Sequence, residues 1–124
     1  MLVALLTLLF LGGGGTNAVL AYIGDSRDAV KEVVMDEERQ DAALDTLKAM
    51  KSRQKEHAKQ VRSTIKALKR ELKGPGSRSD LVAATWDAYF ESQQASNADM
   101  IDLRFQLRDQ LTREEWETIF VADE

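Results

Sequence analysis

The sequence predicts an all-α protein in which an N-terminal apolar helix is followed by a long antiparallel helical hairpin and a short C-terminal helix. Three observations predict this class. The 124 residues are 31% charged and contain one proline, and the aromatic and β-branched residues are too scattered for several strands. No proline or glycine interrupts residues 25–73. Apolar residues also recur at alternating three- and four-residue spacing on both sides of Gly74-Pro75-Gly76.

The first 23 residues carry no charged side chain. A helix of that length would rise about 35 Å, enough to cross a hydrocarbon core of about 30 Å. Glycines 12–15 interrupt the run and leave the apolar block Leu2–Leu11, which has the length of a signal-peptide core. Residues 1–23 are therefore expected to form a membrane anchor or a signal segment, with a buried soluble helix as the third interpretation.

The orientation in a membrane is open to two interpretations. Arg27, Lys31 and Arg39 follow the apolar segment, and the positive-inside rule then favours a cytoplasmic body. An architecture like that of exported proteins favours the opposite side. We expect a single pass of the bacterial inner membrane with the body in the periplasm, where the membrane contact would be made through residues 1–23.

The helical domain is expected to span residues 24–124. Asp25 or Ser26 can cap a first helix over about residues 26–73, and Ser77 or Ser79 can cap a second over about 79–110. Thr112 and Glu115 match a capping box that would begin a third helix over about 113–121. If the chain reverses at Pro75, this third helix should cover the first near residues 30–40.

Charge is unevenly distributed along the predicted hairpin. Residues 48–73 carry 10 basic and 2 acidic side chains, whereas residues 74–124 carry 4 basic and 11 acidic ones. Seven of the cations fall along one side of the first helix and are called the basic stripe: Lys48, Lys55, Lys59, Arg62, Lys66, Lys69 and Lys73. Asp80, Asp87, Glu91, Asp99 and Asp102 are expected to pass at the same heights, so the simplest prediction is that the two helices neutralise each other.

The alternative is that the basic stripe binds an anionic partner. A stripe of this kind can contact an anionic lipid surface or nucleic acid. No aromatic residues interleave with the lysines, and the chain has a net charge of −4, both of which argue against nucleic acid.

A polar layer interrupts the apolar pattern of both hairpin helices at nearly the same height. Its members, called the polar waist, are Gln54, Gln93, Ser96 and Asn97. Buried polar residues set register in coiled coils. Few buried apolar contacts also give low local stability, which would let a partner helix enter. The polar waist is therefore a candidate partner surface.

The sequence contains no catalytic, cofactor-binding or metal-binding signature. Phosphate-loop, dinucleotide, zinc-protease and nucleophile-elbow patterns do not occur. A metal site needs several convergent ligands, so the single histidine, His57, is expected on the surface or at the flank of the apolar seam. Acidic residues 36–38 are interpreted as a solvated face near the start of a helix, where they interact favourably with its dipole.

The stretch Leu111-Thr112-Arg113-Glu114-Glu115-Trp116 resembles the leucine-threonine-x-x-glutamine element of small periplasmic helical proteins, the Spy-like envelope-stress chaperones and the related heavy-metal-resistance sensors. Glu115 stands where that family has glutamine. The resemblance implies a helical hairpin that is exported or membrane-tethered and that senses envelope stress or holds unfolded clients. It assigns no binding residue.

The sequence therefore leads to two functional hypotheses. The first is a membrane-tethered, non-enzymatic helical interaction protein of the bacterial cell envelope, related to stress or chaperone-like, whose partner is another protein or a second copy of the chain. The second is a cytoplasm-facing module that binds anionic lipid or nucleic acid through the basic stripe of residues 48–73.

Overall fold

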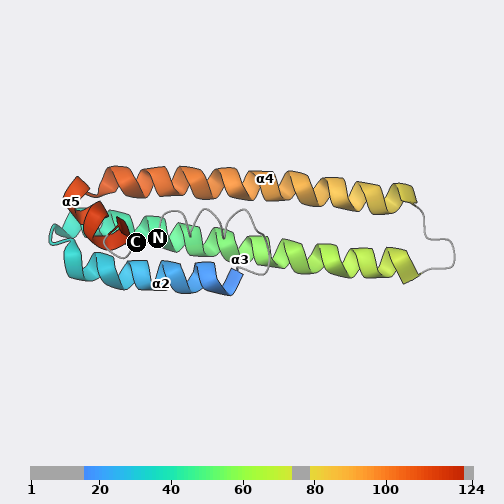
Figure 1. The fold of residues 1–124 in the computed structure, drawn as a ribbon, viewed down its shortest axis with the longest axis horizontal. Coiled ribbons are helices and arrows are strands. Elements are labelled where there is room, and N and C mark those ends of the chain that lie inside the picture. The colour runs from blue at the N-terminus through green and yellow to red at the C-terminus, as the bar shows by residue number, and fades with distance from the viewer. Residues whose placement is uncertain (1–15, 74–78, 122–124) are drawn as a thin grey trace.

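The computed structural model describes residues 16–73 and 79–121, which are all-α. In order, the elements are α2 (Thr16–Val33), α3 (Glu37–Lys73), α4 (Ser79–Gln110), α5 (Arg113–Trp116) and the π-helical segment η2 (Glu117–Val121). α3 and α4 form a long antiparallel hairpin, and α2 lies alongside one half of α3 (Figure 1). The expected turn at Gly74-Pro75-Gly76 and residues 1–15 of the expected anchor or signal segment lie outside the described residues.

The hairpin and the C-terminal helix confirm the sequence analysis. α4 has the predicted limits, and the capping box is present: the Thr112 hydroxyl accepts from the Glu115 amide at 3.1 Å, and the Glu115 carboxylate accepts from the Thr112 amide at 2.8 Å. Glu115 also contacts Arg39, and η2 packs against α2. The third helix therefore lies near the part of the chain predicted for it.

The prediction of one continuous helix over residues 26–73 is wrong. The helix is interrupted at residues 34–36, and the chain reverses there so that α2 runs antiparallel to α3 (Figure 1). Ser26, expected as the first helix cap, lies inside α2, where its hydroxyl donates to the Tyr22 carbonyl at 2.8 Å. α2 also continues without a break across the domain boundary expected between residues 23 and 24.

Side chains next to the break explain why it forms there. The Asp36 carboxylate accepts from the Arg39 amide at 2.9 Å, the contact of an N-cap, and Glu37 and Glu38 occupy the first turn of α3. The Gln40 side-chain amide donates to the Val34 carbonyl at 3.0 Å and to a second carbonyl near the end of α2. A side chain from the first turn of α3 thus satisfies backbone carbonyl groups at the end of α2.

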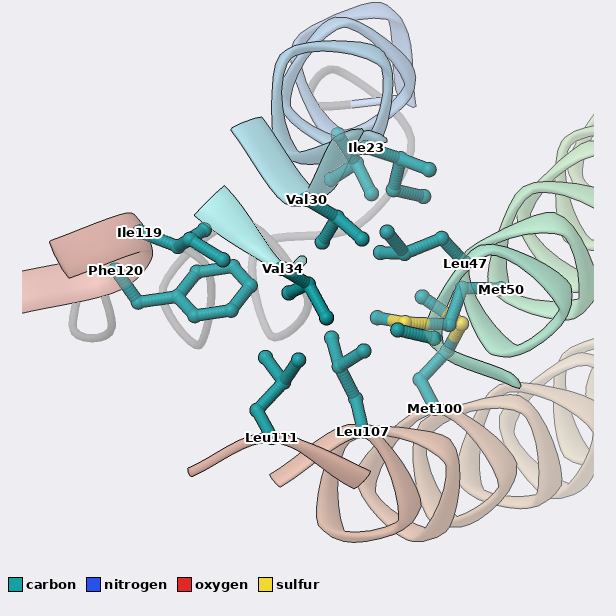
Figure 2. Close-up of a cluster of buried hydrophobic side chains, with 12 residues drawn as sticks. Ile23, Val30, Val34, Leu47, Met50, Met100, Leu107, Leu111, Ile119 and Phe120 are labelled. Atoms are coloured by element: carbon teal, nitrogen blue, oxygen red, sulfur yellow. The ribbon is translucent and has the colours of Figure 1, made fainter. Parts of the chain in front are cut away.

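The buried core lies where α2, α3, α4 and the C-terminal helix meet (Figure 2). Val19 and Ile23 of α2 are 0% and 1% exposed, so the end of the expected anchor segment packs in this core. The other buried apolar residues are Val30, Val34, Ala43, Leu47, Met50, Met100, Leu107, Leu111, Ile119 and Phe120. Burial of a side chain of this size contributes about 1.5–3 kcal/mol, so α2 is a major source of stability.

None of the helices in the described part of the chain is long and apolar enough to cross a membrane. α2 shows why: Asp25, Arg27, Asp28, Lys31 and Glu32 occupy its second half.

The two halves of the hairpin differ in packing. The buried residues of α3 all lie between positions 43 and 57, and those of α4 between 96 and 107. Residues 58–73 and 79–95 include no buried side chain and are called the distal arm. The core therefore supports only the half of the hairpin that α2 and the C-terminal helix cover.

Gly24→Ala should stabilise the protein by about 0.5–1 kcal/mol, because glycine inside a helix is less favourable than alanine by about that amount. A Cβ added at Gly24 would meet no atom within 4 Å. Urea denaturation measures the change, and Ala21→Gly, on an exposed position of the same helix, should lower stability by a similar amount. A destabilised Gly24→Ala protein would contradict a continuous α2.

Candidate interaction surface

The distal arm exposes large apolar side chains that a folded protein normally buries. Ile65 and Leu72 of α3 are 47% and 62% exposed, and Trp86 and Phe90 of α4 are 40% and 52% exposed. These four residues are called the open face. Clustered exposed apolar residues of this size are typical of surfaces that bind another apolar element.

Helical periodicity places the open face on the same side of the hairpin as the core. Residues seven apart on a helix point in nearly the same direction. Trp86 lies two such steps before Met100, Phe90 lies two before Arg104, and Ile65 lies three after Leu44. Met100 is buried in the core, Leu44 packs against it, and the Arg104 guanidinium lies over the Trp116 ring of the C-terminal helix. The open face is thus the continuation of the surface that α2 and the C-terminal helix cover elsewhere.

The aromatic residues of this region form a cluster. The ring of Trp86 stacks on Phe90 with centroids 5.6 Å apart and an interplanar angle of 21°, and it meets Tyr89 edge-on at 5.9 Å. Tyr89 and Phe90 are 5.7 Å apart. Such ring contacts are favourable, and they join Trp86 and Phe90 into one aromatic patch on the open face.

Polar contacts hold the two helices of the distal arm together. The Thr85 hydroxyl donates to the Glu71 carboxylate at 2.7 Å, and the Ser92 hydroxyl donates to the Gln60 side-chain carbonyl at 2.5 Å. The helices thus make part of their contact through hydrogen bonds, while the residues of the open face remain exposed.

The basic stripe is exposed at all seven positions. Within residues 16–73 and 79–121, none of its cations has a carboxylate at ion-pair distance. Of the acidic residues expected to neutralise it, Asp99 pairs instead with Arg53, at 2.9 Å, and Arg53 lies outside the stripe. The expected neutralisation across the hairpin is therefore not observed in these residues, and the stripe borders the distal arm as a free positive edge.

The polar waist lies where the core ends and the distal arm begins. Gln54 and Ser96 are 6% and 2% exposed, whereas Gln93 and Asn97 are partly exposed. Only the latter two can be reached from outside without opening the hairpin. Half of the candidate partner surface is therefore inside the protein.

His57, three residues after Gln54 on α3, is buried, so the expectation that it lies on the surface is wrong. It is 5% exposed, and its Nδ1 has no hydrogen-bond partner among the described residues. Burial lowers the pKa of His57, and the positive charge of Arg53 lowers it further. Because His57 lies seven residues after the apolar Met50, the two side chains point to nearly the same side of α3, and this spacing could have indicated that His57 is buried.

A hollow of about 520 Å³ lies where α2 begins beside α3. Asn17 and Leu20 line it on one side, and Ala58, Lys59 and Arg62 line it on the other, with Ser52, Lys55 and Glu56. Ala58, which lines the hollow, stands seven residues before Ile65 on α3.

The described residues contain no group of histidine and acidic side chains that could hold a metal ion. Comparison of the chain with models of known protein families, with curated proteins and with solved structures gave no match.

The stability of the protein should fall as the pH is lowered from about 7 to 5. In the unfolded chain His57 takes up a proton near pH 6.5, whereas the folded state resists protonation because its pKa is lowered. The unfolded state therefore binds more protons in this range. Urea midpoints at pH 7.5 and 5.5 measure the loss.

His57→Gln is the control for this effect and should show a smaller loss over the same range. The pKa of Glu115 is also lowered, chiefly by its hydrogen bond with Arg39. The stability that Glu115 contributes is therefore lost only below the pH range in which carboxylates ordinarily titrate. This loss does not overlap the range in which His57 is protonated. Equal losses in the two proteins would contradict the role given to His57.

Proposed function

We propose that this chain is a non-enzymatic helical interaction protein whose open face binds an apolar helical segment of another protein. The observation that carries the proposal is the exposure of Ile65, Leu72, Trp86 and Phe90 on a surface that is covered in the other half of the hairpin. Amphipathic helices bind such surfaces through residues at i, i+3, i+4 and i+7 spacing.

The way α2 packs supports this binding mode. Val19, Ile23 and Val30 follow helical spacing along one side of α2, and all three are buried against the hairpin (Figure 2 labels Ile23 and Val30). A partner helix in the same orientation, with apolar residues at the same spacing, would continue this arrangement over the distal arm. The aromatic cluster lowers the entropic cost of binding, because fewer side chains need to be fixed.

Binding is favoured over catalysis by the chemistry of the site. The four residues of the open face have neither titratable nor nucleophilic groups, whereas acid–base and covalent catalysis both require them. Holding apolar segments of unfolded proteins is also the activity implied by the resemblance of residues 111–116 to Spy-like chaperones. The proposal therefore includes a stress-related, chaperone-like role.

We place the protein in the bacterial cell envelope, attached to the inner membrane, with the body in the periplasm. The uncharged run that precedes α2 supports the attachment. Because Val19 and Ile23 belong to the core, the membrane contact is assigned to residues before Thr16. Removal of residues 1–23 as a signal segment would take Val19 and Ile23 out of the core, which favours an uncleaved segment.

A second candidate function is the binding of an anionic lipid surface by the basic stripe. The observation that favours it is that all seven cations are exposed and form no ion pairs among the described residues. Each lysine or arginine close to an anionic membrane contributes about 1 kcal/mol. Such a contact would hold the distal arm along the membrane surface.

Phe90→Ala should weaken binding of an amphipathic leucine-rich helical peptide by about tenfold, because a buried aromatic anchor is lost. Fluorescence anisotropy of the labelled peptide measures the affinity. Phe105→Ala is the matched control, since Phe105 lies on the same helix at 53% exposure but outside the open face. Equal effects of the two substitutions would contradict the proposed site. Binding should also change little between low and high salt, because the contact is apolar.

Lys66→Gln should weaken association with vesicles that contain an anionic phospholipid by about fivefold if the basic stripe binds membranes. Cosedimentation at low ionic strength measures this change. Arg108→Gln, which removes the same charge from an exposed position outside the stripe, should have less effect. Vesicle binding that is absent, or equally reduced by both substitutions, would remove the second candidate function.

A further inference from the structure

We infer that the partner of the open face is an acidic amphipathic helix, whose apolar side packs on the open face and whose carboxylates pair with cations of the basic stripe. This inference rests on the proposed function and names the chemistry of the partner. The observation that carries it is the position of Arg62 and Lys69 beside the exposed apolar residues of α3.

These two cations lie directly beside the open face. Residues three and four apart are neighbours on the surface of a helix. Arg62 is three residues before Ile65, and Lys69 is four residues after Ile65 and three before Leu72. All four of these side chains are exposed. A helix that packs on Ile65 and Leu72 therefore comes within reach of both cations.

The chain itself does not neutralise this edge. Within residues 16–73 and 79–121, neither Arg62 nor Lys69 has a carboxylate at ion-pair distance. Arg62 also lines the hollow beside α2 together with Lys55 and Lys59 of the basic stripe, and one carboxylate, that of Glu56, lines it as well. The positive charge at this edge is thus available to carboxylates of a partner.

The α4 side of the open face has a different character. Among the residues three or four positions from Trp86 or Phe90, the one charged residue is Asp87. The others are Val82, Ala83, Tyr89, Gln93 and Gln94. Positive charge therefore borders the open face on the α3 side alone. We expect the carboxylates of the partner along the flank that lies over α3.

A second copy of the chain does not match this charge. α2 and the C-terminal helix cover the same side of the hairpin at its other end, so two copies that meet through their open faces must run in opposite directions (Figure 1). A twofold axis then places α3 against α3. The Arg62 and Lys69 edges of the two copies would lie side by side, and like charges repel.

A flat lipid bilayer fits the open face less well than a helix does. Because α2 and the C-terminal helix lie on the same side of the hairpin, the open face is recessed beside them by about the diameter of one helix, or about 10 Å. A single helix can lie in this recess next to the end of α2. A flat surface would meet α2 and the C-terminal helix first.

Three leucine-rich helical peptides that differ only along one flank test the inference with the full-length protein. The flank carries glutamate, glutamine or lysine. At low salt the glutamate peptide should bind about fivefold more tightly than the glutamine peptide, because two exposed ion pairs form, and the lysine peptide should bind more weakly. Fluorescence anisotropy measures the affinities. At high salt the three affinities should converge, since salt screens exposed charges.

Arg62→Glu combined with Lys69→Glu should reverse the order, so that the lysine peptide binds about fivefold more tightly than the glutamate peptide. A gain of binding requires a folded protein, so unfolding of the variant cannot produce this result. Arg70→Glu combined with Arg108→Glu is the matched control, because it makes the same change in net charge at exposed positions outside the basic stripe. The control should keep the original order.

Equal and Phe90-dependent binding of the three peptides would overturn the inference and leave the proposed function standing. An order that changes equally in both double variants would also overturn it, because the preference would then come from net charge. If no peptide binding depends on Phe90, the proposed function itself fails.

Two further results would assign the surface to another occupant and so overturn the inference. Vesicles of an anionic phospholipid that bind through Arg62 and Lys69 and displace the glutamate peptide would assign the basic edge to a membrane. A dimer that forms without peptide and is lost in Phe90→Ala would assign the open face to a second copy. Sedimentation with and without vesicles measures both.

Discussion

The packing of α2 against one end of the hairpin is the constraint on which the rest of the described structure depends. The 18 described residues of α2 extend about 27 Å along α3, whose 37 residues extend about 55 Å. The core forms where α2 and the C-terminal helix meet α3 and α4. Along the distal arm no described helix lies on this side of the hairpin, and the residues of the open face are exposed there.

The corner at residues 34–36 determines which half is covered, and the C-terminal helix strengthens it. Asp36 caps α3, Gln40 satisfies carbonyl groups at the end of α2, and Arg39 pairs with Glu115. Glu115 is also part of the capping box that begins α5. Capping, ion pairing and apolar burial are therefore concentrated at one end of the molecule, where three chain segments support one another.

This uneven distribution gives the two ends different physical properties. Dense apolar packing makes the covered end the stable part, whereas the distal arm has few buried contacts and should open at lower free energy. The polar waist and His57 lie between them, where burial of polar groups limits how far the core can extend. An apolar helix added to the distal arm would extend the core past this layer and stabilise the arm. Binding and local stability are thus coupled in the proposed function.

The sequence by itself determined the helical class, the antiparallel hairpin, the limits of α4 and the capping box at Thr112 and Glu115, because these depend on local periodicity and on side chains a few residues apart. It also contained Asp36 and Gln40, the residues that cap the helices at the break at residues 34–36. In the sequence, however, Asp36 resembled a solvated acidic residue, and Gln40 resembled a polar interruption of the apolar pattern. Their roles as caps became visible only once α2 folded back.

Four features depend on the tertiary structure alone. Val19 and Ile23 enter the core, and His57 is buried. The basic stripe remains unpaired within the described residues, and Trp86 and Phe90 are exposed. Each of these depends on which helix lies opposite which, over separations of tens of residues. Helical periodicity shows that a residue belongs to an apolar side, but it does not show whether another helix is long enough to cover that side. That physical limit is why the apolar sides of the hairpin helices were predictable and the exposed part of these sides was not.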